Sequence, residues 1–141
     1  MSALTNLDIL RYVDRENLPN FRGVFMRDTL PRSGPNHTEC GVVNLNTSHE
    51  PGSHWVCYFK DGEKRIYFDS FGQITPIEIQ KYLKTSEEIK KNAMVIQRNT
   101  DIVQAISSSN CGQLCLVVLK GLTSGVSFQQ IINTLRCHGY S

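Results

Sequence analysis

Cys111 and His54 are the residues of this sequence best suited to nucleophilic catalysis. A cysteine attacks as its thiolate, which forms near neutral pH only beside a positive charge or at a helix N-terminus. Cys111 opens the apolar run CGQLCLVVLKG, which predicts a buried helix that begins at the cysteine and is closed by Gly121. The helix dipole and an imidazolium from His54 would then stabilise the thiolate. The sequence therefore predicts Cys111 as nucleophile and His54 as its base.

The other cysteines lack this setting. A free cysteine is among the most buried residue types, so an isolated one is more often a small core residue. We interpret Cys40, Cys57 and Cys137 in that way, and we expect Cys115, one helical turn from Cys111, to pack beneath it. Five cysteines without a C-x-x-C pair fit neither a disulfide framework nor a zinc site. Free thiols in a reducing compartment, and no metal, are expected.

A predicted hairpin would bring an acid next to His54. The aromatic run HWVCYFK is followed by Asp61-Gly62, a strong hairpin signal, and then by KRIYFDSF. The two strands would place His54 and Asp69 at the same end of the sheet, where the acid can orient the imidazole. A lone histidine is more often structural, and Asp69 in FDSFG also suits a plain turn.

Gln104 alone suggests no function, and it acquires a role only together with Cys111, His54 and Asp69. Its side-chain amide, with the backbone N–H of Cys111, would donate to the oxyanion of a tetrahedral intermediate. Gly112 would let a substrate backbone approach closely. The residues that flank the candidate pair are expected to bind substrate: Gly52, Ser53, Trp55, Asn110 and Gly112.

The remaining chain supplies the elements that must position these residues. Hydrophobic periodicity and turn signals predict a helix from Thr5 to near Pro19, an irregular loop over 27–38, strands over 40–45, 54–60, 64–68 and 94–97, and helices over 76–83, from Cys111 and over 128–135. This order predicts one α+β domain spanning residues 1–141. We expect a mostly antiparallel or mixed sheet of about four or five strands, packed against the buried Cys111 helix and flanking helices.

Composition argues against two classes of protein. The net charge of +2 comes without dense basic clustering, and the charged residues between 87 and 91 have mixed signs, which favours a solvated helix face. This is unlike a dedicated nucleic-acid module. The start MSALTNLDIL lacks the features of a signal peptide, and no apolar run approaches the roughly 20 residues that span a bilayer. A soluble, intracellular protein without membrane contact is expected.

Three segments together resemble a known family: GSHWVCYF, IYFDSFG and VQAISSSNCGQLCL. Their order of histidine, acid, glutamine and cysteine is similar to that of the adenovirus-type maturation proteases, which share a clan with the SUMO-specific proteases. NFRGVFMRDTLP and CGVVNLNTS are also similar to adenain-like enzymes, including those of Maverick/Polinton elements and virophages. The resemblance covers roughly residues 20–122.

The resemblance implies a cysteine endopeptidase with an adenain-like, papain-related fold, the triad Cys111, His54 and Asp69, and a Gln104 oxyanion hole. It implies capsid or core precursor polypeptides as substrates, cut near small residues, in the host cytoplasm or nucleus and inside the virion. Asp69 stands where the adenoviral enzymes commonly use Glu. No cofactor is required by the sequence, although a peptide or DNA activator, with weak DNA contact, is allowed by analogy.

Ala93-Met94 stands where the adenoviral enzyme keeps the cysteine that bonds its activating peptide, which argues against a disulfide-linked peptide here.

Besides the protease, two further interpretations stay open at the sequence level. The same catalytic residues would also serve a SUMO or ubiquitin isopeptidase. A catalytically silent binding module is the third interpretation, although such a module has no physical need to keep all four residues.

Overall fold

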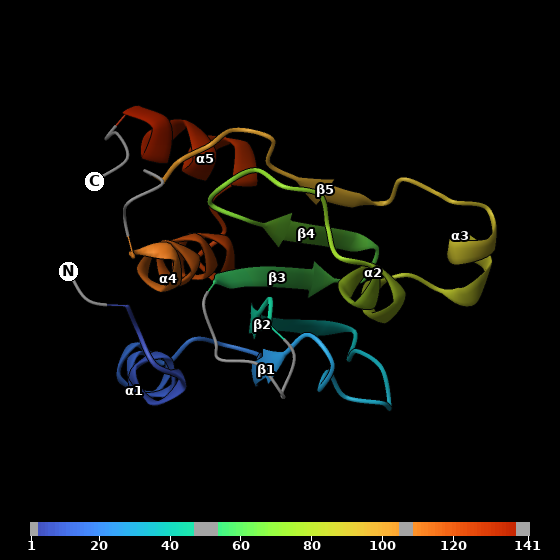
Figure 1. Cartoon of the computed structure of the whole chain (residues 1–141), viewed down its shortest axis with the longest axis horizontal. Helices are drawn as coiled ribbons and strands as arrows, with labels where there is room; N and C mark the ends of the chain where they lie inside the picture. Colours follow the sequence, from blue (N-terminus) through green and yellow to red (C-terminus); the bar gives the residue numbers. More distant parts are fainter. Residues whose placement is uncertain (1–2, 47–53, 105–108, 138–141) are drawn as a thin grey trace.

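The structure is a computed structural model that describes residues 3–46, 54–104 and 109–137. A five-stranded sheet lies at its centre (Figure 1). The strands are adjacent in chain order: β1 (Phe21–Met26), β2 (Thr38–Asn44), β3 (Trp55–Asp61), β4 (Lys64–Phe68) and β5 (Ile96–Arg98). β3 is antiparallel to both neighbours, whereas the outer pairs β1–β2 and β4–β5 are parallel. The α+β class is confirmed, with a mixed sheet.

The predicted hairpin is present and sets the geometry of one end of the sheet. β3 and β4 pair from Asp61 with Lys64 to Cys57 with Phe68. Gly62 in the turn has φ of +61°, a left-handed conformation that glycine adopts without strain. Because the strands are antiparallel, the start of β3 and the end of β4 meet at the same sheet end.

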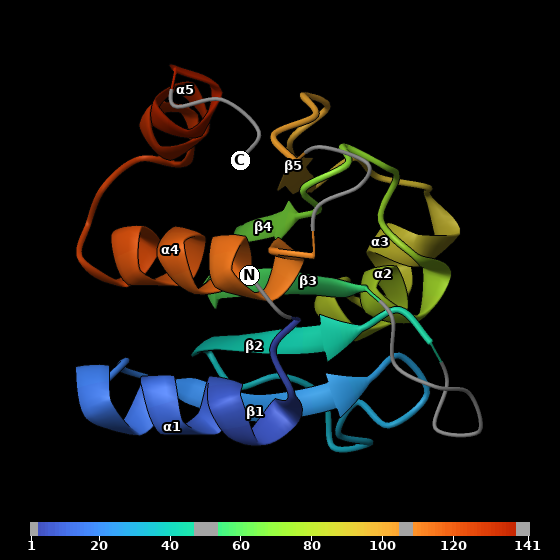
Figure 2. The ribbon, with the colours of Figure 1, turned by 60° about the vertical axis from the view of Figure 1, so that its left-hand side comes forward.

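Helices lie on both faces of the sheet, and the described residues form five of them (Figures 1 and 2). They are α1 (Asn6–Glu16), α2 (Ile77–Leu83), α3 (Ser86–Lys90), α4 (Cys111–Thr123) and α5 (Phe128–Cys137). α1 and α4 lie on one face and α2 on the other, while α5 packs beside α4. α3 agrees with the solvated helix face expected over 87–91, since none of its residues is buried. Within the described ranges, no helix is both long and apolar enough to cross a membrane.

Strand alternation divides the buried residues into two cores. Val42 and Cys57 point to the face of α1 and α4, whereas Val43 and Tyr58 point to the face of α2. Successive side chains of a strand leave opposite faces of a sheet, so each of the central strands β2, β3 and β4 contributes to both cores. The middle of the sheet is therefore buried between helices, whereas the edge strands β1 and β5 are partly exposed.

α4 begins at Cys111, as the apolar run predicts, and buries most of its length against β3. The expectation that Gly121 closes this helix is wrong, because α4 continues to Thr123. A Cβ on Gly121 would lie 2.7 Å from Cδ1 of Ile131 on α5. The glycine therefore permits close packing of the two helices and does not end the first of them.

Helix caps agree with the sequence at two helix starts. The Thr5 hydroxyl accepts from Asp8 N–H and the Asp8 carboxylate accepts from Thr5 N–H, which completes a capping box at α1. The Ser127 hydroxyl accepts from Gln130 N–H at 3.2 Å ahead of α5. Pro76 is the N-cap of α2 and not its first residue, so the helix begins at Ile77, one position later than expected.

One strand was missed, and two further predictions need correction. β1 was not predicted, because Arg22 and Gly23 interrupt its apolar pattern and all its residues are half-buried. The strand expected over 94–97 is shifted to Ile96–Arg98, since Met94 is 98% exposed and lies outside the sheet. Cys137 is exposed at the end of α5 and is not a core residue.

Candidate active site

His54 and Asp69 meet at the sheet end defined by the hairpin. His54 directly precedes β3 and Asp69 directly follows β4. Nε2 of His54 lies 2.7 Å from Oδ1 of Asp69, and the carboxylate is 1% exposed. The ring of Phe71 stacks on the imidazole, with centroids 4.9 Å apart. The acid and the aromatic ring together fix the orientation of the imidazole.

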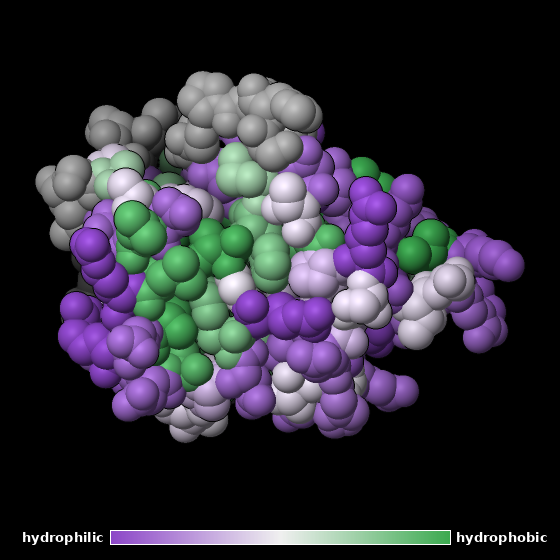
Figure 3. Space-filling view, turned by 90° about the horizontal axis from the view of Figure 1, so that it is seen from below, coloured by the Kyte–Doolittle hydropathy of each residue, from purple (hydrophilic) through white to green (hydrophobic). Residues whose placement is uncertain are grey.

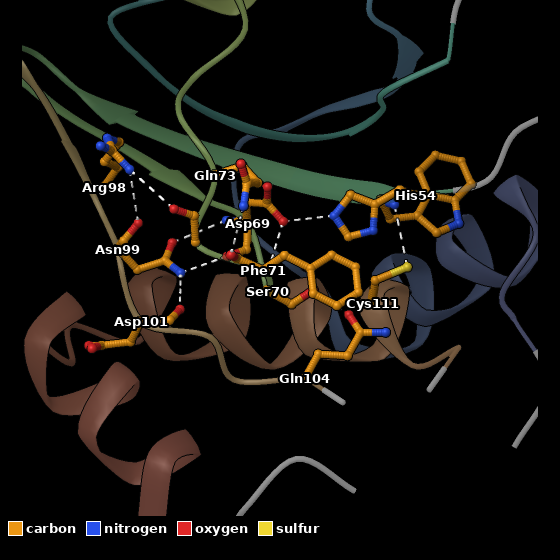
Figure 4. Close-up of polar contacts among 12 residues, drawn as sticks. His54, Asp69, Ser70, Phe71, Gln73, Arg98, Asn99, Asp101, Gln104 and Cys111 are labelled. Carbon is orange, nitrogen blue, oxygen red and sulfur yellow. Dashed lines mark hydrogen bonds and ion pairs between the residues drawn. The ribbon is translucent and has the colours of Figure 1, made fainter. Parts of the chain in front are cut away.

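The Cys111 thiol lies on the other side of the same imidazole. Figure 4 shows the ring between the Asp69 carboxylate and the Cys111 sulfur. The backbone N–H of Trp55 donates to this sulfur at 3.4 Å, and residue Cys111 is 5% exposed. Because Cys111 is the first residue of α4, the positive end of the helix dipole adds to these donors.

The charges of the pair are coupled. Burial opposes protonation of the imidazole, but the hydrogen bonds with Asp69 and Cys111 outweigh it and raise the pKa of His54 to about 9. Burial also disfavours the thiolate, yet hydrogen bonds from His54 and from the Trp55 and Gly112 amides lower the pKa of Cys111. Both shifts therefore favour the thiolate–imidazolium form of the pair.

The neighbouring thiols behave in the opposite way. Burial raises the pKa of Cys40 to about 12 and raises that of Cys115 well above its ordinary value. Cys115 is fully buried one turn after Cys111, and the thiol of Cys57 donates to its carbonyl at 3.7 Å. These cysteines are core residues, as expected, and only Cys111 combines a lowered pKa with a catalytic neighbour.

Gln104 is placed beside this pair by a loop that follows β5. Its side chain is 2% exposed, and Ser70 Oγ donates to its Oε1. Figure 4 shows the amide nitrogen on the side of Cys111. The structure thus brings together all four residues that the sequence singled out, including Gln104, which lies in no helix or strand.

Two supporting residues were missed from the sequence. Asn99 clamps the backbone of Asp69: its Oδ1 accepts from Asp69 N–H at 3.1 Å, and its Nδ2 donates to Asp69 O at 2.6 Å. Ser70 is the second. A buried Asn after an edge strand and a Ser after a candidate acid were the only signals available. Neither is specific without the three-dimensional contact.

The five residues expected to bind substrate have different outcomes. Gly52 and Ser53 lie outside the described residues. Trp55 lines a cavity beside Cys111, and its indole N–H donates to Leu4 O at 2.9 Å. Asn110 is the buried N-cap of α4 and does not line that cavity. A Cβ on Gly112 would lie 3.1 Å from Trp55 and 3.2 Å from Leu4, so its close neighbours here belong to the chain itself.

A groove leads from Cys111 across the end of the sheet. Its cavity of about 780 Å³ is bordered by Leu4 and Thr5 just before α1, Val24 and Met26 of β1, and the pair of Cys111 and His54. Figure 3 shows apolar side chains gathered on the face that carries α1 and β1, where Leu7 and Leu10 are exposed. The described residues include no group of His, Cys, Asp and Glu able to hold a metal ion.

Comparisons with known proteins identify relatives of the chain. The family described as adenovirus endoprotease matches residues 21–135. A protease of snake adenovirus serotype 1 is 27% identical over 92 residues, covering 57% of this chain and 45% of that protein. The chain thus spans about half the length of this curated relative.

Solved structures show the same fold. The crystal structure of an ASFV protease has a TM-score of 0.60 at 18% identity and covers 93% of this chain and 61% of that one. The SUMO protease Ulp1 has a TM-score of 0.50 at 14% identity, covering 95% of this chain and 74% of that one. With the family match over most of its length, the chain belongs to the adenovirus endoprotease family.

Proposed function

We propose that the chain is a cysteine endopeptidase with Cys111 as nucleophile, His54 as general base and acid, and Asp69 as the residue that orients the imidazole. The observation that carries the proposal is the imidazole held between a buried carboxylate at 2.7 Å and the thiol at the start of α4. The raised pKa of His54 and the lowered pKa of Cys111 suit this role.

Acylation follows from these positions. The Cys111 sulfur attacks the carbonyl carbon of the scissile peptide, a C–S bond forms, and the carbonyl π electrons move to oxygen. The Gln104 amide and the backbone N–H of Cys111 donate to this oxyanion, and that N–H has no acceptor inside its own helix. The C–N bond then breaks as the imidazolium of His54 protonates the leaving amine.

Deacylation uses the same groups in reverse. Neutral His54 takes a proton from water, which attacks the thioester carbon. The C–S bond breaks and the acid product leaves, while the imidazolium again faces a thiolate. Asp69 stabilises the charged imidazole in both halves of the cycle.

The proposed substrates are capsid or core precursor polypeptides of a virus or virus-like element, cut during virion maturation. Membership in the adenovirus endoprotease family supports this class of substrate. The groove beside Cys111 suits an extended polypeptide, because its β1 side is apolar. Leu4 and Trp55 crowd the start of α4, which favours small residues next to the scissile bond.

Activators and location are part of the same proposal. A disulfide-linked peptide is not expected, because the positions before β5 carry Ala93 and the exposed Met94. DNA is expected to stimulate only modestly and in a salt-sensitive way, given the net charge of +2. The enzyme would act at the assembly site in the host cell and inside the virion.

The first experiment is alkylation by iodoacetamide at neutral pH, read residue by residue by mass spectrometry. Wild type should label fastest at Cys111, and His54→Ala should remove that advantage. Cys111→Ala is the control that assigns the reactive peptide. If Cys111 labels no faster than the exposed Cys137, the proposed catalytic pair is wrong.

Substrate class needs a separate assay. Wild type should process capsid precursors of a related virus, and Cys111→Ala should not. The likeness in fold to Ulp1 favours one rival, a ubiquitin-like-protein isopeptidase. Cleavage of SUMO or ubiquitin conjugates with capsid precursors left intact would support that rival. Failure to cleave either class, with normal Cys111 alkylation, would favour a silent binding module.

A further inference from the structure

Ser70 connects the segment that carries Asp69 with the loop that carries Gln104. It follows Asp69 directly, its side chain is fully buried, and its hydroxyl donates to Oε1 of Gln104. Its carbonyl accepts from Val103 N–H at 2.8 Å. One residue therefore contacts the Gln104 loop through both its side chain and its backbone, 34 positions away in sequence.

The bond to Oε1 determines which end of the amide faces the thiol. An amide side chain has an accepting oxygen on one side and a donating NH₂ on the other. With the oxygen held by Ser70, the nitrogen lies toward Cys111 (Figure 4). If the amide turned over, its oxygen would face the developing oxyanion and repel it.

We infer that Ser70 is the positioning residue of the oxyanion hole: its hydroxyl holds the Gln104 amide so that the NH₂ group faces the oxyanion formed at Cys111. The inference rests on the proposed function. Asp69 and Ser70 then act as one dipeptide, in which the first residue orients the base and the second orients the oxyanion donor.

The loop around Ser70 is built to keep this contact. Asn99 holds the backbone of Asp69 on one side, and Gly72, with φ of +67°, brings the turn against Thr100. A Cβ on Gly72 would lie 2.5 Å from the carbonyl oxygen of Thr100. The two loops are therefore packed backbone to backbone, and the hydroxyl of Ser70 meets a side chain with little freedom to move.

A structural role for Ser70 makes a different prediction from a positioning role. A buried hydroxyl that only stabilises the fold would affect stability, whatever residue stands at 104. A positioning hydroxyl should matter for oxyanion binding only while the Gln104 amide is present. A double-mutant cycle separates the two.

The probe is a peptide that ends in Gly-Gly and carries an aldehyde in place of its C-terminal carboxylate. Its affinity is measured by how well it protects Cys111 from iodoacetamide. The thiolate adds to the aldehyde carbon, a C–S bond forms, and the former carbonyl oxygen becomes an alkoxide in the oxyanion hole. Alkylation by iodoacetamide breaks a C–I bond and releases iodide without any oxyanion. The two reagents therefore separate the oxyanion hole from the Cys-His pair.

Ser70→Ala should weaken aldehyde affinity about tenfold, and Gln104→Ala by about 10²-fold or more. Ser70→Ala in the Gln104→Ala background should cause no further loss, and all three variants should alkylate within about twofold of wild type. Thr75→Val, which removes a buried hydroxyl elsewhere, is the matched control and should leave aldehyde affinity unchanged.

The outcomes are distinct. Equal losses from Ser70→Ala with and without Gln104, or unchanged aldehyde affinity, would overturn the role of Ser70. Slow alkylation of Cys111 in the wild type would instead overturn the proposed function. If Ser70→Ala fails to fold, Ser70→Cys retains a weaker donor and should give an intermediate loss of affinity. Full affinity in Ser70→Cys would also count against the proposal.

Discussion

The protein buries two carboxylates at opposite ends of the sheet, and their surroundings differ. Glu39 on β2 is 1% exposed, and each of its oxygens accepts two hydrogen bonds. The donors are the hydroxyls of Tyr58 and Tyr82 at 2.6 and 2.7 Å, the Arg22 guanidinium at 2.8 Å and the Asn36 N–H at 2.7 Å. Glu39 is saturated and pairs with a counter-ion.

Asp69 is equally buried but less fully bonded. Its Oδ1 accepts from His54 and from Phe71 N–H at 3.0 Å. Its Oδ2 is buried and has no hydrogen-bond partner in the described part of the chain. The charge of Asp69 is therefore compensated mainly by the imidazolium, which contributes to the raised pKa of His54.

The difference fits a structural role for Glu39 and the proposed orienting role for Asp69. A saturated buried charge stabilises its donors and has no capacity to respond to a reaction. A buried charge with one main partner transmits its electrostatic effect to that partner, as an orienting acid must. Substitutions at Asp69 should therefore affect activity, and those at Glu39 stability.

Asp69→Asn should give the largest effect. The exchange keeps the shape of the side chain but removes the charge that favours the imidazolium, so kcat/KM should fall by about 10²- to 10⁴-fold. The assay is hydrolysis of a peptide that the wild-type chain cleaves. Urea unfolding should show a stability within about 1 kcal/mol of wild type. A large loss of stability with nearly full activity would contradict the comparison.

Glu39→Gln should produce the opposite pattern. Breaking a buried ion pair leaves Arg22 without its counter-ion and costs about 3 kcal/mol or more of unfolding free energy. The change is read from the urea midpoint at constant m-value. At 25 °C the folded variant should keep kcat/KM within a few-fold of wild type, because the substitution is at the far end of the sheet. A selective loss of activity would show that the two ends are coupled.

The contrast also shows which residues could be predicted from the sequence. The turn at Asp61-Gly62 placed His54 and Asp69 together, and the apolar run placed Cys111 at a helix start. These are local signals, each contained in a short continuous segment, and they predicted the His54–Asp69 pair and the helix start at Cys111. Gln104 came from the family resemblance, since no local pattern surrounds it.

The residues that support the site could not be predicted in this way. Asn99 and Ser70 act through contacts with segments 30 and 34 positions away. Glu39 accepts hydrogen bonds from residues on β1, β3 and α2, and none of these donor residues is close to Glu39 in sequence. Such contacts depend on the final packing of the sheet, and single polar residues carry no periodic pattern that would announce them.

The pH dependence sharpens the comparison at the catalytic end. The pKa of His54 is raised to about 9, so the imidazolium that protonates the leaving amine persists below that pH and is lost above it. The kcat/KM of wild type should therefore fall about tenfold per pH unit above pH 9. Its acidic limb should lie below the pKa of an ordinary thiol, because that of Cys111 is lowered. In Asp69→Asn the alkaline limb should move to lower pH, and an unmoved limb would argue that Asp69 does not set the imidazole pKa.

Tyr82→Phe should give the smallest effect and tests saturation at Glu39 directly. The variant removes one of four donors while the ring keeps its edge contact with Tyr58 at 5.7 Å. Three donors remain, so the loss of unfolding free energy should be about 1 kcal/mol, the value of one hydrogen bond. Tyr12→Phe on α1 is the matched control and should change stability by less than about 0.5 kcal/mol. A loss from Tyr82→Phe as large as that from Glu39→Gln would mean that the cluster acts as a single cooperative network, in which no one donor is redundant.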